Sequence, residues 1–364
     1  MILERYLAWR FLASLLTVSG VFIGLLLLID MVEQLRRFAQ HPVGLAEAAR
    51  LSALNLPMVF YRILPLVTLL ATVAAFLALA RNSELVAMRA AGRSGLRLLV
   101  APVLAAALVG VASVAILNPI VAATSQRYDI VSDRLRGGDG SAVSISREGL
   151  WLREAVTEGQ RVIRAERAGG DGTRLGVVTV LVFDNERGPL RRIEAEEARL
   201  QAGHWALQAV KDWDLTADNP ERAAQVRDRL DLPSDLTQAR LRDSFGAPAS
   251  IPIWDLPGFI AQLDEAGFSA RQHRVWLQME LALPVLLAAM VLLGASFTMR
   301  HARAGRVGGL VLLAIIAGFG VYSLRNLAQL LGDTGQIPVA LAAWTTPGAA
   351  LLLALGHLLY REEA

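Results

Sequence analysis

The chain has 364 residues, of which 54% are hydrophobic and 19% charged, and its formal net charge is +3. This balance excludes an ordinary soluble domain and indicates a membrane protein. Cysteine is absent, which excludes disulfides, thiolate catalysis and cysteine-ligated metal sites. The only lysine, Lys211, follows no glycine-rich turn, so a P-loop for ATP is also excluded.

Six uncharged runs of at least 18 residues are long enough to cross a membrane as helices. They cover residues 11–29, 63–80, 98–126, 281–299, 307–324 and 334–360. The first run has no small-residue cleavage site and continues into a helical pattern, so we expect a retained span rather than a signal peptide. The sequence therefore predicts three transmembrane helices, a polar domain and three more transmembrane helices.

Arginines in the short loops indicate the orientation of the spans, because basic residues concentrate in cytoplasmic loops. With the N-terminus inside, the inner segments hold ten arginines: Arg5, Arg10, Arg81, Arg89, Arg93, Arg97, Arg300, Arg303, Arg306 and Arg361. The short outer loops hold four: Arg36, Arg37, Arg50 and Arg62. We therefore expect both termini in the cytoplasm and the central domain on the other side.

Charged residues gather where spans end at the outer side. Asp30, Glu33, Arg36 and Arg37 follow the first uncharged run, Arg62 precedes the second, and Arg325 follows the fifth. Such charges often reach into the headgroup region, but four arginines at one level could also bind the phosphates of a lipid. Small residues on the same two spans, Gly20 and Gly24 in the first and Gly318 and Gly320 in the fifth, indicate ordinary helix contacts or a movable seam.

The loop between the second and third spans carries helix signals over about residues 82–92. Asn82 or Ser83 can cap a helix, Glu84 falls in its first turn, and Gly92 can end it. We predict a short cytoplasmic helix parallel to the membrane. It is either a capped connector or a docking helix that presents Arg81, Glu84, Met88 and Arg89 to a partner.

The central domain, residues 127–252, has the pattern of an all-β fold. From Gly149 onward, short segments of period two alternate with turn residues, which predicts consecutive antiparallel strands in a sandwich or roll. A roll has open edges and an interior that can hold an apolar chain, but the pattern fits a domain without a site equally well. Residues 253–267 predict an amphipathic helix on the outer membrane surface, so the third part of the chain, residues 253–364, starts there.

Enzyme signatures are missing from the sequence. It has no His-Glu-x-x-His helix or Gly-x-Ser-x-Gly turn, and its five histidines are scattered. We expect no catalytic residue, metal or cofactor on this chain. An intramembrane enzyme would also need a paired acid, base, nucleophile or metal set inside the spans, which the sequence does not provide.

Several segments resemble the LptF/LptG permease family of the lipopolysaccharide export transporter. These are Glu4-Arg-Tyr-Leu7, Glu33-Gln-Leu-Arg-Arg37, residues 81–92, Gly149-Leu-Trp151 and Trp254-Asp-Leu-Pro257, so the resemblance covers essentially the whole chain. Residues 83–92 are the most specific. Residues 149–151 and 307–309 look closer to the LptG branch than to LptF.

The resemblance implies a permease in the bacterial inner membrane that extracts lipopolysaccharide from the outer leaflet and passes it through a periplasmic, jellyroll-like domain to a transport bridge. The implied partners are an LptF-like permease chain, two copies of an LptB-like ATPase that binds ATP and Mg, and an LptC-like protein. Arg81, Ser83, Glu84, Met88, Arg89 and Gly92 would form the coupling helix, with Glu84 seated in the ATPase.

The resemblance also makes the first and fifth helices lateral gates. Arg36 and Arg37 would contact lipid phosphates, with Arg62 and Arg325 as further candidates. Asp30 stands where some members of the family carry a lysine one helical turn before the arginine pair, which argues against a lipid contact there.

A competing hypothesis is a membrane scaffold without transport, in which an ATPase partner moves the outer β domain to regulate another envelope protein. An apolar lining of the β domain would favour lipid transfer, whereas a polar interior and a tight core without a slot would favour the scaffold.

Overall fold

The computed structural model describes residues 2–39, 44–135, 142–146, 149–156, 159–169, 173–184, 188–234, 236–237, 247–299 and 307–363. Arg300, Arg303 and Arg306, which contribute to the predicted orientation, lie outside the described residues. The chain forms two compact units. The first combines Met1–Ser132, Pro252–Trp254 and Arg271–Ala364, and the second combines Asp133–Ile251 and Asp255–Ala270.

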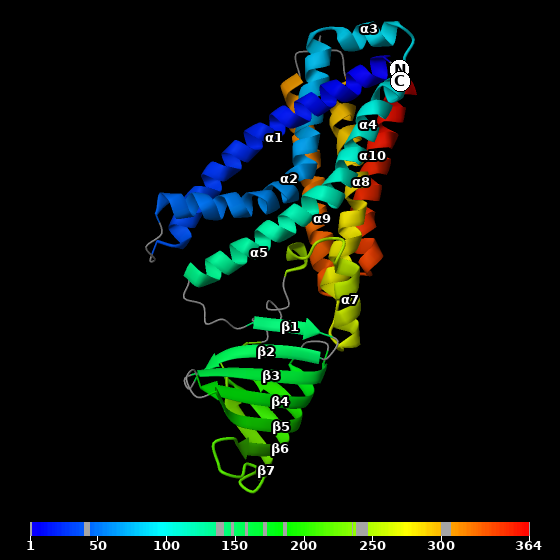
Figure 1. Cartoon of the computed structure of the whole chain (residues 1–364). Helices are drawn as coiled ribbons and strands as arrows, with labels where there is room; N and C mark the ends of the chain where they lie inside the picture. Colours follow the sequence, from blue (N-terminus) through cyan, green and yellow to red (C-terminus); the bar gives the residue numbers. More distant parts are fainter. Residues whose placement is uncertain are drawn as a thin grey trace. The chain divides into compact units, whose positions relative to one another are not determined.

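Six long apolar helices of the first unit are able to cross a membrane, which confirms the predicted spans. The first two are α1 (Ile2–Arg37) and α2 (Leu45–Arg81), which bends in Figure 1 and contains Pro57 and Pro65. The third span joins α4 (Gly95–Ala112), the π-helical segment η1 (Ser113–Leu117) and α5 (Asn118–Leu135). The last three are α8 (Arg271–Thr298), α9 (Val307–Asp333) and α10 (Val339–Glu363).

Helix α8 is the centre of this unit and packs against α2, α4, α9 and α10. Of the most apolar 18-residue window of each span, 78% is buried in α8, but only 6% in α1 and 11% in α9. Because apolar side chains in a membrane protein face lipid or another helix, α1 and α9 are the two spans most open to lipid or a partner.

The second unit contains a seven-stranded antiparallel sheet. Its strands are β1 (Ala142–Ser146), β2 (Gly149–Val156), β3 (Gly159–Ala168), β4 (Arg174–Asp184), β5 (Gly188–Gln201), β6 (His204–Asp214) and β7 (Gln225–Pro233). Each strand pairs with the next one along the chain, as Figure 1 shows. The prediction of an inserted all-β domain is confirmed, and the described strands are connected as a simple meander.

Alternating side chains fill the interior of this sheet, but the alternation changes phase at one row of residues. In β4, two residues that are not buried separate the buried residues Leu175 and Val178, where regular alternation would place one. In β6, two such residues separate Leu207 and Val210. At this row Val177 and Ala209 have φ angles of 51° and 52°, in the left-handed region that side chains other than glycine rarely adopt. The row therefore forms a crease that keeps apolar side chains on the inner face along the whole strand.

Helix α7 (Leu256–Glu265) belongs to the sheet unit. Its Leu263, together with Phe268 and Ala270 after it, lies in the same hydrophobic core as the strands, and Phe259 and Ile260 pack against that core. The helix expected on the membrane surface therefore has its apolar side covered by the sheet. The helix is amphipathic as predicted, but its apolar side packs against the sheet and not against lipid.

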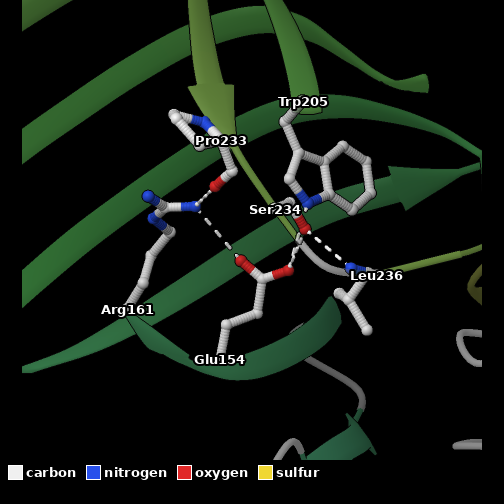
Figure 2. Close-up of polar contacts among 6 residues, drawn as sticks. All are labelled: Glu154, Arg161, Trp205, Pro233, Ser234 and Leu236. Carbon is white, nitrogen blue, oxygen red and sulfur yellow. Dashed lines mark hydrogen bonds and ion pairs between the residues drawn. The ribbon is translucent and has the colours of Figure 1, made fainter. Parts of the chain in front are cut away.

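A buried polar cluster joins the segment after β7 to β2, β3 and β6 (Figure 2). Glu154 and Arg161 form an ion pair of 3.2 Å, and both side chains are less than 10% exposed. The hydroxyl of Ser234 donates to Glu154 at 2.6 Å, and Trp205 Nε1 donates to the same oxygen at 3.4 Å. Arg161 also donates to the carbonyl of Pro233 at 2.8 Å. We call these residues the polar clasp, because they fasten the end of the meander to its first long strands.

Candidate functional site

A short helix, α3 (Glu84–Ala90), connects α2 to α4 (Figure 1). Ser83 before it and Gly92 after it have φ angles of 59° and 80°, so left-handed residues form both turns. The side chain of Ser83 makes no capping hydrogen bond, whereas Ser94 caps α4 by accepting from the amide of Arg97 at 3.4 Å. The predicted helix is present between these turns.

The two sides of α3 differ in burial. Leu85 is buried in the core of the helical unit, and Met88, one turn later, packs against the same core. Arg81 and Arg89 are exposed, and Val86 is 44% exposed. The outward face thus carries arginines and Val86, and Met88 anchors the helix instead of joining the face on which the sequence placed it.

Glu84 is bound to the N-terminal end of α1. The hydroxyl of Tyr6 donates to Glu84 Oε2 at 2.7 Å, and Arg10 forms an ion pair of 3.6 Å with Oε1. Asn82 donates to Oε1 at 3.3 Å. The hydrogen bond from Tyr6 is the main cause that lowers the pKa of the Glu84 carboxyl. The carboxylate is therefore ionised at neutral pH and fixes α3 to α1.

The four arginines predicted at the outer side come from three helices. Arg36 forms an ion pair with Glu33 at 3.7 Å, and 83% of its side chain remains exposed. Arg37 is exposed and donates to the hydroxyl of Tyr128 on α5 at 2.9 Å. Arg62 on α2 is exposed, and Arg325 on α9 is partly buried. Two of the four predicted residues thus keep a guanidinium on α1 that is accessible to an anion.

Asp30 has a structural role beside this pair. It accepts hydrogen bonds from Asn55 of α2 at 2.7 Å and from Gln34 one turn later at 3.3 Å. Gln34 is 1% exposed and accepts from Tyr128 at 3.2 Å. Asp30 therefore helps to hold the C-terminal end of α1 on α2 and α5, which explains why a carboxylate is accommodated at this position.

Comparisons with known proteins place these features in a family. Residues 5–361 match the model of the family described as lipopolysaccharide export system permease LptF/LptG. This chain belongs to the LptF/LptG permease family. It is 24% identical to the lipopolysaccharide export system permease protein LptG of Haemophilus influenzae, over 92% of this chain and 91% of that protein. It is also 24% identical to LptG of Escherichia coli K12, over 100% of this chain and 99% of that protein.

The glycines predicted to pack in this LptF/LptG family member have different surroundings. A side chain added at Gly318 would meet Leu69 of α2 at 2.8 Å, so Gly318 lets α9 approach α2 closely. Among the described residues, nothing lies within 4 Å of such a side chain at Gly20, Gly24 or Gly320. In this part of the chain their side of each helix is uncovered, so it can contact another molecule.

Sequence reasoning missed some residues of this permease that bring helices together. A β-carbon at Gly110 would lie 2.5 Å from the Cα atom of Pro284, so α4 and α8 touch there. Glu280 lies inside α8 with 1% exposure, although the uncharged run starts after it. Its helical neighbours Trp276 and Leu283 are also buried, and this apolar face around a carboxylate is the signal that could have identified it.

Proposed function

We propose that this chain is the LptG-like subunit of the lipopolysaccharide exporter. It takes lipopolysaccharide from the outer leaflet of the bacterial inner membrane and passes it through its β domain toward a transport bridge. In this proposal both termini are cytoplasmic and the β domain is periplasmic. The family supplies the general activity, and the details rest on the following properties of the chain.

The apolar interior of the β domain carries the proposal. Side chains such as Leu152, Ile163, Val180, Ile193 and Leu207 point inward from five successive strands. An acyl chain has the same chemistry as this lining, so it can replace protein contacts without loss of apolar burial. In the described sheet β1 pairs only with β2 and β7 only with β6, so each leaves one edge at which the roll can open.

The outer end of α1 supports the entry step. Its arginines offer guanidinium groups to lipid phosphates, and large apolar side chains such as Leu25, Leu28 and Val32 are more than 50% exposed below them. Helix α9 is similarly uncovered, with Phe319 61% exposed. These faces suit an LptF-like partner chain together with the acyl chains of the lipid.

The cytoplasmic side supports the coupling step. We propose that two copies of an LptB-like ATPase bind ATP and Mg, and that one of them docks on α3. Since Glu84 joins α3 to α1, a displacement of α3 is transmitted to the helix that carries the outer arginines. An LptC-like protein would receive the lipid beyond the β domain.

Photocrosslinking in intact envelopes tests the transport path. A photoreactive amino acid at Leu207, which faces the interior, should capture lipopolysaccharide in an ATP-dependent manner. The same photoreactive amino acid at Gln208, the exposed neighbour on β6, is the matched control and should capture no lipopolysaccharide.

The scaffold hypothesis predicts the opposite pattern. Position 207 would then capture no lipid under any condition, while an outward position such as 208 would capture an envelope protein. Absence of lipid capture at position 207 would overturn the transport path. The apolar interior is the observation that favours transport over the scaffold.

A further inference from the structure

The polar clasp joins two corners of the β sheet that would lie far apart if the sheet were flat. Glu154 and Arg161 are directly paired on β2 and β3, beside the turn that connects these strands. Trp205 lies near the start of β6 and Pro233 ends β7, beside the turn that connects β5 to β6. Because neighbouring strands run in opposite directions, these two turns are at opposite ends of the sheet. The clasp contacts therefore require the sheet to fold over from corner to corner.

The crease lies between these two corners. It crosses β3 to β7 in one row of residues: Glu166, Val177, Glu196, Ala209 and Asp228. Pairs between neighbouring strands are present on both sides of this row, but in the described sheet they are interrupted at the row itself. The positive φ angles of Val177 and Ala209 add backbone strain there. A row with fewer backbone contacts and strained residues is where the sheet bends most easily.

The part of β5, β6 and β7 beyond the crease is here called the flap. It consists of residues 197–208 in β5 and β6 and residues 229–234 at the end of β7. Buried apolar side chains of the flap belong to the same core as those of β2 and β3, and they are Ala198, Trp205, Leu207 and Leu232. The flap thus covers one side of the apolar interior. When the flap lifts, an acyl chain can replace these contacts, because it has the same chemistry.

The clasp contacts all cross from the flap to β2 and β3. The hydroxyl of Ser234 donates to Glu154 at 2.6 Å, and Trp205 Nε1 donates to the same oxygen at 3.4 Å. Arg161 donates to the carbonyl of Pro233 at 2.8 Å, and Figure 2 shows these groups pointing toward one another. A buried ion pair regains hydration when it is exposed, and its hydrogen bonds exchange for bonds to water. Such a contact can therefore be released at a small net cost.

We propose that the flap is a lid on the apolar interior, hinged at the crease and latched by the polar clasp, and that it lifts to admit an acyl chain. The hinge and the latch concern this chain alone. The admission of an acyl chain rests on the proposed function. In the lifted state water replaces the flap partners of Glu154 and Arg161, and the acyl chain replaces the contacts of Leu207.

Spin labels on introduced cysteines can report the position of the flap, because the natural chain has no cysteine. Gln201→Cys on the flap and Arg153→Cys on β2 use exposed positions on the two sides of the crease. The sample is the purified full-length complex in nanodiscs without lipopolysaccharide or ATP. Ser234→Ala removes one hydrogen bond to a charged group and should raise the population at long distances about fivefold or more. Glu154→Gln should raise it at least as much.

Ala209→Gly should act in the opposite direction. Glycine adopts a positive φ without strain, so the substitution removes a cost from the closed state. In the Ser234→Ala background it should lower the population at long distances about twofold or more. Ala206→Gly, on the same strand but without a positive φ, is the matched control and should not lower it.

Three results would overturn the hinged lid. Parent distances in both clasp variants would reject the latch, and no decrease with Ala209→Gly would reject the hinge. The third concerns labels at Arg153→Cys and Arg192→Cys, which lie on the same side of the crease and should keep their distance in every variant. An equal change in this pair would show that the whole domain loosens and that no separate flap moves.

The lipid half is tested with the photoreactive amino acid at position 207 in envelopes depleted of ATP. Ser234→Ala should raise capture of lipopolysaccharide about threefold or more over the parent, because the lid is released without its partner. Open distances without this rise would reject the admission of an acyl chain and leave the hinge and the latch in place. Absence of capture in the parent with ATP would instead mark the failure of the proposed function, on which the label distances do not depend.

Discussion

The hydroxyl of Tyr6, near the start of α1, donates a hydrogen bond of 2.7 Å to Glu84, the first residue of α3. The two residues are 78 positions apart and belong to different helices. Their contact means that the carboxylate expected to face an ATPase is already bound within its own chain. A partner that docks on α3 therefore acts on α1 as well.

Tyr6→Phe should separate ATP hydrolysis from export. The substitution removes one hydrogen bond to a carboxylate at a partly exposed site and keeps the ring, so we expect export to fall about two- to fivefold while the complex still assembles and hydrolyses ATP. Lipopolysaccharide release from proteoliposomes and ATPase activity measure the two steps. Trp9→Phe, at an exposed position on the same helix, is the control. A parallel loss of hydrolysis and export would contradict a linking role for Tyr6.

The contact between α1 and α3 should resist moderate acid. Its hydrogen bond from Tyr6 lowers the pKa of Glu84 below the ordinary value of 4.5. A carboxyl whose pKa is lower in the folded state stabilises that state above its unfolded pKa, and this stabilisation is lost as the pH falls through the folded pKa. Distances between spin labels at Trp9→Cys and Val86→Cys should stay constant from pH 8 to about pH 5 and change only below 4.5. A change between pH 8 and 6 would mean that another group controls the contact.

The polar clasp should be more sensitive to the loss of one charge than to the loss of both. Glu154→Leu leaves Arg161 buried without its carboxylate, which costs roughly 3 kcal/mol or more, whereas Glu154→Leu with Arg161→Leu should cost less than either single change. Ser234→Ala should cost about 1 kcal/mol. Amide hydrogen exchange in β2 and β3 of the full-length protein measures the differences. A double variant that exchanges faster than both single ones would show that the charges themselves stabilise the domain.

Two glycine substitutions should distinguish a glycine that packs against another helix of this chain from one whose surface is uncovered. Gly110→Ala places a methyl group 2.5 Å from the backbone of Pro284 and should destabilise the protein by about 1–3 kcal/mol. Gly20→Ala meets nothing within 4 Å and should leave the unfolding temperature of the isolated chain unchanged. Thermal unfolding in detergent compares the two. Equal shifts would contradict the close approach of α4 and α8.

The arginine pair on α1 should control stimulation by lipid. Arg36→Glu with Arg37→Glu reverses two charges at the outer end of the helix, so we expect stimulation of the ATPase by lipopolysaccharide to fall about fivefold or more, with basal hydrolysis unchanged. Arg50→Glu, also exposed but paired with Glu47, serves as the control. Normal stimulation in the double variant would remove the phosphate contact from the mechanism.

The sequence predicts the spans and the strands of this protein because both follow from local rules. A membrane core demands long uncharged runs, and a half-buried strand demands alternation, so the run at 11–29 and the alternating segments after Gly149 could be interpreted without a structure. What covers an apolar face is not local. The stripe on residues 253–267 fits a membrane surface as well as a sheet, and only the fold shows Leu263 in the core of the β domain.

Two other features were missed for a related reason. The crease requires Val177 and Ala209 to adopt positive φ, which neither residue type favours, so the surrounding sheet imposes it. Glu280 stands at the edge of an uncharged run, where charges normally reach water. Its burial depends on Tyr61 and Asn118, which approach from other spans. Contacts between distant segments decide both cases.

The strand order of the β domain sets a sequence of assembly events. Every strand after the first pairs with the one made just before it, so the sheet can grow one hairpin at a time as the chain is made, without waiting for a distant partner strand. Ser234 and the core residues of α7 follow the last strand and arrive after it. The strands and α7 all precede α8, α9 and α10 in the chain, so the β domain can fold before the last three spans are synthesised.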